Sequence, residues 1–207
     1  MVRTNNAINQ PVGLYIGVFQ FCFTQLLRLI LLTKGKLFKN IKLNPLDSSS
    51  RYVIASNHQS RLDPFVIGMV FSFAQKRKLS PIKYMLYPGL YHSILKPLFF
   101  SLGCYPAHAK YHPYHTAGVE GSIKLLGKGY NVCIFPEGRR TLQSESSPYN
   151  GISRILAGYT EANLILAHIE WERKGWWRRN VHVKVENAPP GIDVADPQKI
   201  MEAIYKL

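Results

Sequence analysis

Two short groups of polar residues, far apart in the chain, carry the side chains best suited to chemistry. The first reads NHQSRLD and contains His58 and Asp63. On one continuous helix these two would stand about 140° apart, so they can pair only across a turn. Asp63 is followed by Pro64, a combination typical of a helix start, with Asp at the N-cap and Pro at the first helical position. This predicts that the carboxylate folds back on an imidazole in the preceding loop.

That pairing would give His58 a defined chemical role. A carboxylate that accepts from one ring nitrogen leaves the other as a base, which can take a proton from a hydroxyl. The alternative is that Asp63 is only a helix cap and His58 only a surface loop residue.

The second group reads FPEGRR and presents one acid and two guanidinium groups. Pro136 and Gly138 predict a tight turn that carries Glu137, Arg139 and Arg140. The forked donors of arginine suit bidentate binding of phosphate. Taken alone, the same residues also fit a solvated charge cluster on a loop.

Each group directly follows a strand-like run. We expect strands at residues 51–56, 130–135, 164–171 and 181–186, and a helix over residues 64–76. Strands separated by helices predict an α/β fold with a largely parallel central sheet flanked by helices. Ligands of such sheets bind beyond the carboxyl ends of the strands, which is where both groups lie.

Residues 12–32 form the most apolar stretch of the chain. It is not a secretory signal, because the apolar part is too long and neither a charged leader nor a small-residue cleavage site flanks it. A narrow stripe of small and polar residues recurs at helical spacing, opposite a wide face of Phe and Leu. Its members are Gly13, Gly17, Gln20, Thr24 and Arg28.

This pattern favours a membrane-associated helix. Either the helix lies in the interface, or it spans once with Lys34, Lys36, Lys39 and Lys42 on the cytoplasmic side. A buried core helix is the remaining alternative. A turn around Asn44 and Pro45 then predicts a boundary between a membrane-association segment, residues 1–46, and a domain, residues 47–207.

The charge of the chain supports an anionic partner. The 207 residues hold 26 basic and 12 acidic side chains, a net +14, and residues 1–119 contain only two acids, Asp47 and Asp63. Nucleic acid or acidic phospholipid would satisfy this charge, and the apolar helix favours a membrane phospholipid surface over nucleic acid. A non-catalytic basic protein that binds membrane or nucleic acid remains the alternative.

The cysteines and clustered histidines give weaker indications. Three scattered cysteines indicate a reducing compartment, so we expect the domain at the cytoplasmic face of a membrane. His108, His112 and His115 lack neighbouring acids or cysteines, and we expect no metal site. The apolar segment 84–105 could line an acyl-chain groove, dip into the membrane, or be plain core.

NHQSRLD followed by FPEGRR resembles the two signature motifs of the glycerolipid acyltransferases, the family that includes the lysophosphatidic acid acyltransferases. The similarity covers about residues 50–190. It implies the fold of those enzymes and acyl transfer from acyl-CoA or acyl carrier protein to a hydroxyl, without a cofactor and without a covalent acyl-enzyme. The implied product from a lysophosphatidic acid acceptor is phosphatidic acid; another lysophospholipid or an ornithine lipid is the alternative acceptor.

The resemblance also assigns roles to individual residues. It makes His58 the general base and Asp63 its orienting partner. Glu137 and Arg140 then bind the phosphate region of the acceptor, and Gly138 shapes the turn. We expect three further cations to contribute to substrate binding: Arg139, which replaces the usual Thr, Arg61, and Lys110, which stands one place after the usual Arg of the family's second motif, between these two groups.

Overall fold

The computed structural model describes residues 11–91, 93–107, 117–140, 147–174 and 178–207. The helices are α1 (Pro11–Lys34), α2 (Asp63–Val70), α3 (Phe73–Leu79), α4 (Pro88–Tyr91), α5 (Lys96–Ser101), α6 (Ala117–Gly127), α7 (Gly151–Gly158) and α8 (Pro197–Tyr205). The strands are β1 (Leu37–Lys42), β2 (Arg51–Ser56), β3 (Ile82–Leu86), β4 (Cys104–Pro106), β5 (Asn131–Ile134), β6 (Ala162–Lys174) and β7 (Arg178–Asn187).

The strands of the described part of the chain form one sheet, in the order β1-β7-β6-β2-β5-β3-β4. Five neighbouring strands, from β6 to β4, run parallel. The long β6–β7 hairpin is antiparallel and β1 pairs in parallel with β7, so β1 and β7 run against the other five strands. The fold is therefore a mixed, mostly parallel sheet, as the alternation of strands and helices in the sequence predicted.

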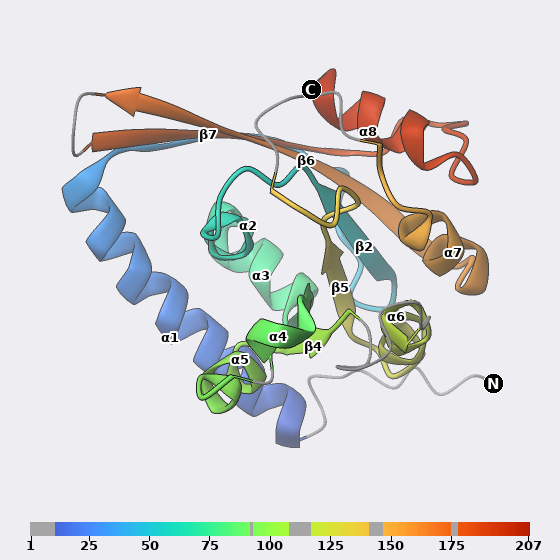
Figure 1. Ribbon diagram of the computed structural model, residues 1–207, viewed down its shortest axis with the longest axis horizontal. Helices are drawn as coiled ribbons and strands as arrows, with labels where there is room; N and C mark the ends of the chain where they lie inside the picture. The colour runs from blue at the N-terminus through green and yellow to red at the C-terminus, as the bar shows by residue number, and fades with distance from the viewer. Residues whose placement is uncertain (1–10, 92, 108–116, 141–146, 175–177) are drawn as a thin grey trace.

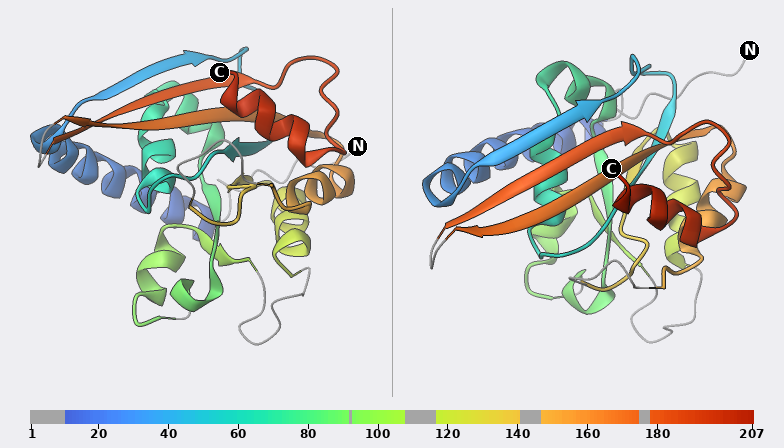
Figure 2. Two further views of the ribbon diagram at one scale, coloured as in Figure 1. Left: turned by 45° about the horizontal axis from the view of Figure 1, so that its top comes forward. Right: turned by 90° about the horizontal axis from the view of Figure 1, so that it is seen from above.

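Helices cover both faces of the sheet, and each face has its own apolar core (Figures 1 and 2). On one side, α2 and α3 pack Val66, Ile67 and Leu79 against the sheet. On the other side, α6, α7 and α8 bury Leu126, Ile155 and Ile204. Strand β2 contributes to both cores because its alternate side chains face opposite ways, and all six of its residues are buried.

The helix expected over residues 64–76 is divided into α2 and α3. The chain is extended at Phe71 and Ser72, and Ser72 begins α3 as an N-cap. Its hydroxyl accepts from the Gln75 backbone N–H, while the Gln75 side chain accepts from the Ser72 N–H. This reciprocal capping box gives the chain a second helix start where apolar periodicity alone predicted continuity.

Helix α1 lies along one side of the molecule, with α2 and α3 between it and the sheet (Figure 1). Most of its small and polar stripe faces the protein: Gly13, Gln20 and Thr24 are buried, together with the apolar Ile16, whereas Arg28 at the end of the stripe is exposed. The Gln20 side chain donates to the carbonyl oxygens of Ile82 and Leu102, at 2.6 and 2.8 Å, and accepts from the Ile82 N–H. A buried amide with three backbone partners fixes α1 to β3 and to the end of α5.

Candidate active site

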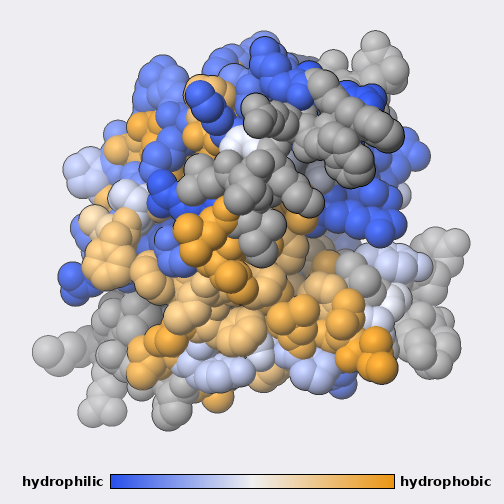
Figure 3. Space-filling model, turned by 90° about the vertical axis from the view of Figure 1, so that its left-hand side faces the viewer, coloured by the Kyte–Doolittle hydropathy of each residue, from blue (hydrophilic) through white to orange (hydrophobic). Residues whose placement is uncertain are grey.

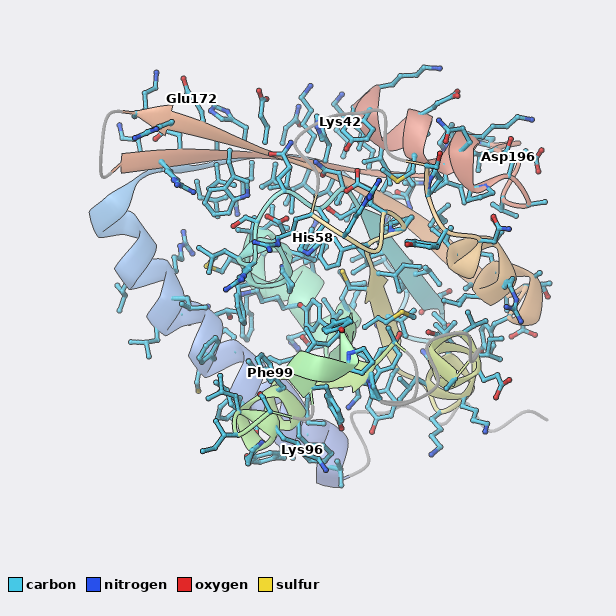
Figure 4. All side chains as sticks on the ribbon, in the orientation of Figure 1. Lys42, His58, Lys96, Phe99, Glu172 and Asp196 are labelled. Carbon is cyan, nitrogen blue, oxygen red and sulfur yellow. The ribbon has the colours of Figure 1, made fainter. Side chains whose placement is uncertain are left out.

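The loops after β2 and β5 meet at one edge of the sheet. The two strands are parallel neighbours, with Val53 opposite Val132 and Ala55 opposite Ile134. Parallel strands bring their carboxyl ends to the same edge, so NHQSRLD and FPEGRR become adjacent although they are distant in sequence. Figure 4 shows His58 near the centre of the view, beside the loops that follow β2 and β5.

His58 and Asp63 form the predicted pair. The distance between His58 Nδ1 and Asp63 Oδ2 is 2.9 Å. The carboxylate has no solvent exposure, whereas 19% of the His58 side chain is accessible. The imidazole also stacks on the ring of Phe135, with 4.4 Å between centroids, so residues from both loops hold it. A partly accessible imidazole above a buried carboxylate is suited to exchange a proton with a bound molecule.

The surroundings of Asp63 determine which ring nitrogen carries the proton. Oδ2 also accepts from the backbone N–H groups of Gln59 and Ser60, both at 2.7 Å, and Oδ1 accepts from the indole N–H of Trp171 at 2.8 Å. An ionised carboxylate only accepts hydrogen bonds, and donors surround this one. His58 therefore donates through Nδ1–H, which leaves Nε2 as the basic nitrogen.

The expected N-cap role of Asp63 is wrong. The N-cap of α2 is Leu62, and Asp63 is already the first helical residue, followed by Pro64. The carboxylate points back into the loop, where the N–H groups of Gln59 and Ser60 satisfy it. The Asp–Pro pair did predict the helix start and the backward fold of the carboxylate.

Glu137 is fully buried and bonded to the protein. Oε2 accepts from the backbone N–H of His58 at 2.9 Å, and Oε1 accepts from the hydroxyl of Tyr205. The carboxylate thus ties the FPEGRR loop both to the histidine loop and to the end of α8. Its burial and its two partners differ from the accessible, ligand-facing position expected of a residue that contacts an acceptor.

The other candidate binding residues lie at the surface of this edge. Gly138 closes the predicted turn: its N–H donates to the Phe135 carbonyl, and its φ of +61° is a conformation that favours glycine. Arg61, Arg139 and Arg140 are exposed, and none forms an ion pair with another described residue. Lys110, His108, His112 and His115 lie outside the described residues. Among the described residues, no group of three or more His, Cys, Asp or Glu could hold a metal ion.

Three residues that support the site were not identified from the sequence. Asn57 pairs both its amide groups with the backbone of Ile169, which extends the contact between β2 and β6 beyond Ser56. Trp171 and Tyr205 contact Asp63 and Glu137 from distant parts of the chain. Asn57 belongs to the first motif, and that position is a signal for its role, whereas nothing local to Trp171 or Tyr205 indicates a contact over such separations.

A largely apolar cavity of about 90 Å³ lies beside the site, between α1, α2, α5 and β3. Arg61 and Pro64, from the NHQSRLD loop and the start of α2, line it together with apolar side chains that include Phe65, Met85 and Phe99. Lys76 also lines it; burial, together with the nearby cations Arg28 and Lys39, lowers the pKa of this lysine. The cavity therefore offers an apolar space within reach of the polar loops.

The fold and this geometry define a class: an α/β protein with a histidine held by a buried carboxylate at the carboxyl edge of its sheet. Residues 38–160 match the family model described as "Acyltransferase", and the chain belongs to that family. It is 25% identical over 199 residues to a "Probable 1-acyl-sn-glycerol-3-phosphate acyltransferase" of Mycoplasma pneumoniae, covering 88% of this chain and 73% of the relative.

Its fold is similar to the crystal structure of the LPA acyltransferase PlsC from Thermotoga maritima. The TM-score is 0.56 at 14% identity, and the match covers 92% of this chain and 74% of the other. The chain is thus an acyltransferase related to the lysophosphatidic acid enzymes, and the mixed sheet is that of PlsC.

Proposed function

We propose that the protein transfers a fatty acyl group from a thioester, acyl-CoA or acyl carrier protein, to the free hydroxyl of lysophosphatidic acid, yielding phosphatidic acid. The observation that carries this proposal is the 2.9 Å contact of His58 with a buried Asp63 that also accepts three further hydrogen bonds. It supports His58 as the general base and Asp63 as the group that orients it.

In this reaction His58 Nε2 takes the proton of the acceptor hydroxyl as its oxygen attacks the thioester carbonyl. The C–O ester bond forms and the C–S bond breaks. The proton on Nε2 then passes to the departing thiolate, so the enzyme returns to its starting state. Asp63 stabilises the imidazolium between these two transfers, and no acyl-enzyme bond is needed.

The exposed cations of the edge suit a phosphate on the acceptor. We assign its binding to Arg61, Arg139 and Arg140, with Lys110 as a further candidate, and we assign to Gly138 the turn that presents the two adjacent arginines. Glu137 then contributes by holding the loop from behind, since both its oxygens already accept hydrogen bonds. The apolar cavity beside Arg61 accommodates part of an acyl chain.

The outer side of α1 supports placement in a membrane interface. Over Val12–Leu29 the mean hydropathy is 1.4, and 22% of this window is buried. The exposed apolar side chains continue from α1 onto the neighbouring elements, and Figure 3 shows apolar surface gathered on this side, below a hydrophilic region. We call this surface the apolar face; its members are Val12, Leu14, Tyr15, Val18, Phe21, Leu26, Leu29, Phe73, Ile94, Leu95 and Phe100.

An in-plane helix fits these contacts better than a spanning one. A spanning α1 would have to leave the domain and give up the buried contacts of Ile16 and Gln20. A helix that keeps one side on the protein and presents the other to lipid satisfies both. We therefore propose that α1 is the membrane-association element and that the domain binds one leaflet from its cytoplasmic face.

The test is the release of free thiol from long-chain acyl-CoA, or from acyl carrier protein loaded with a fatty acyl group, in the presence of lysophosphatidic acid and detergent or vesicles. We expect acceptor-dependent release by the wild type and a loss of about a hundredfold or more in His58→Ala. His182→Ala is the matched control, because this histidine lies on β7 and stacks on Phe38 away from the site. Full activity of His58→Ala would refute the mechanism.

The acceptor is tested in the same assay with a panel. Lysophosphatidic acid, a lysophospholipid with a larger headgroup, an ornithine lysolipid and glycerol 3-phosphate are compared at equal concentration. The proposal expects the highest kcat/KM for lysophosphatidic acid. A strong preference for another lysolipid would keep the acyltransferase and replace the acceptor, whereas no transfer to any of them from either donor would overturn the function.

A further inference from the structure

The histidine loop is held from two sides by side chains near the end of the chain. Trp171 lies on β6 and Tyr205 at the end of α8, both beyond residues 38–160 that match the family model. Neither belongs to the two motifs. Each reaches a buried carboxylate of the site, Asp63 in one case and Glu137 in the other.

Trp171 fixes the orientation of the Asp63 carboxylate. Its indole N–H donates to Oδ1 at 2.8 Å, while the other three hydrogen bonds of Asp63 all go to Oδ2. Its backbone N–H also donates to the Gln59 side chain at 3.3 Å. The indole packs against the apolar core, so its N–H direction is set by the sheet rather than by the loop. Without this donor, Oδ1 would lose its hydrogen bond to the indole, and the orientation of the carboxylate would depend on the three hydrogen bonds to Oδ2 alone.

Tyr205 acts one step further from the imidazole. Its hydroxyl donates to Glu137, whose other oxygen accepts from the His58 backbone N–H. Burial and the Glu137 carboxylate raise the pKa of Tyr205, so the hydroxyl keeps its proton over the working pH range. The ring is held edge-on to His168 at 5.5 Å, and the adjacent Ile204 is fully buried. Helix α8 therefore fixes Glu137, and Glu137 fixes the backbone of His58.

We propose that Trp171 and Tyr205 are positioning residues of the acyl transfer, which hold the His58–Asp63 pair in its reactive geometry through Asp63 and Glu137. The inference rests on the proposed function, with His58 as base. A general base must lie within hydrogen-bond reach of the proton that it removes, so a small displacement lowers the rate of the chemical step more than substrate binding. A misplacement of the reacting groups by about 1 Å can lower the rate by about 100-fold.

The experiment removes one donor at a time. Trp171→Phe deletes the indole N–H and keeps an aromatic ring, and Tyr205→Phe deletes only the hydroxyl. We expect kcat to fall about tenfold in each, with KM changed less than about twofold. Tyr159→Phe is the matched control, since Tyr159 packs in the same core as α8 and its hydroxyl makes no hydrogen bond to another described residue. This control should retain the wild-type kcat.

A double-variant cycle separates positioning from general stability. If Tyr205 acts through Glu137, then Tyr205→Phe has no further effect on kcat once Glu137→Ala has removed the acceptor. If the two substitutions instead lowered kcat by independent factors that multiply in the double variant, the proposed action of Tyr205 through Glu137 would be refuted. A rise in KM with an unchanged kcat would refute positioning for either residue and indicate a binding role instead.

A second measurement is independent of the acceptor. In protein with ¹⁵N-labelled histidine, the imidazole N–H signal of His58 is identified by its disappearance in His58→Ala. We expect Trp171→Phe and Tyr205→Phe to shift this signal, and Tyr159→Phe to leave it unchanged. Shifted signals in a protein that transfers no acyl group would overturn the proposed function but keep the positioning of the pair. Unchanged signals in both variants would overturn this inference even if the enzyme is active.

Discussion

At the scale of single residues, the candidate base depends on the donors that surround Asp63 as much as on His58. Four hydrogen bonds hold the buried carboxylate of Asp63, and the carboxylate in turn fixes the orientation of the His58 ring through Nδ1. The exposed arginines nearby have no such support from the described residues. Their substitution should therefore affect the binding of an anionic ligand without disturbing the pair.

The first prediction concerns phosphate recognition. We expect Arg140→Gln to raise the KM for lysophosphatidic acid about tenfold with little change in kcat, because a charge-assisted contact to phosphate is lost. The same variant should leave the KM for a monoacylglycerol, which has no phosphate, unchanged. Arg77→Gln, an exposed change on α3, serves as the control. Equal effects on both acceptors would contradict a phosphate contact.

The second prediction concerns the stability of the protein against pH. Burial of Lys83 on β3 lowers its pKa from 10.5 to about 8, with its ammonium group over the ring of Tyr130. The unfolded chain thus binds more protons between pH 8 and 10.5, so this lysine makes the free energy of unfolding rise with pH in that window. Below pH 8 the folded state bears the full unfavourable contribution, on the order of 3 kcal/mol.

Lys83→Met tests this directly. We expect the variant to be more stable than the wild type by about 1–3 kcal/mol at pH 7, and the difference to shrink as pH rises toward 10. Denaturant unfolding of both proteins at several pH values measures the free energy of unfolding of each. In the difference between the two values, the contributions of the titratable groups that both proteins share cancel. Lys128→Met, an exposed change after α6, should show no such trend. If the wild type were less stable than Lys83→Met by the same free energy at pH 10 as at pH 7, the shifted titration of Lys83 would be refuted.

The spacing of His58 and Asp63 along the chain, with the helix start at Pro64, was sufficient to predict their contact, because a local turn joins the two residues. It was not sufficient for Glu137. A carboxylate in a charged loop is equally consistent with facing a ligand or facing the protein, and Tyr205, which decides between these orientations, is 68 residues away. Contacts of this kind depend on the packing of whole elements, which local sequence does not encode.

At the scale of elements, strand prediction succeeded where apolar β-branched runs are buried, and it missed β1 and β4 at the two sheet edges and β3 beside β4. The four expected strands correspond to β2, β5, β6 and β7. Strand β1, with the sequence LFKNIK, has mostly exposed residues and two lysines, so it resembled a basic flank of the helix. The short strands β3 and β4 overlap the two ends of the apolar segment 84–105, which has no period of two.

The third prediction concerns how α1 is attached. In Gln20→Leu, the Ile82 N–H and the carbonyls of Ile82 and Leu102 lose a hydrogen-bond partner. We expect the free energy of unfolding to fall by about 2–4 kcal/mol, because buried polar groups are left without compensation. Denaturant unfolding in detergent measures the loss. Gln25→Leu is the control, since its side chain makes no hydrogen bond within the described part of the chain; equal stability of the two variants would refute the attachment.

At the scale of the whole molecule, net charge and apolar surface act together. A chain of net +14 with apolar side chains exposed on one side is suited to an anionic bilayer, because electrostatic attraction adds to apolar insertion. The two contributions respond differently to salt. Only the electrostatic part is screened, so the apolar part determines how firmly the protein is retained at high ionic strength.

The fourth prediction tests the apolar face. We expect Val18→Asp combined with Leu29→Asp to weaken binding to vesicles that contain anionic phospholipid by at least about tenfold, while the wild type resists 1 M salt and is released by detergent. Val194→Asp is the control, because this exposed residue precedes α8, on the other side of the molecule from α1 (Figure 1). Wild-type retention of the double variant, or full release of the wild type by salt alone, would refute insertion.

The attachment of α1 by Gln20 has a practical consequence for preparing the protein. A helix that supplies partners to the backbone of β3 and α5 is not a removable anchor, since its deletion would uncover polar backbone groups and the apolar cavity together. A water-soluble form of the enzyme is therefore better sought by replacing the outward side chains of α1 with polar ones than by truncating the chain before residue 35.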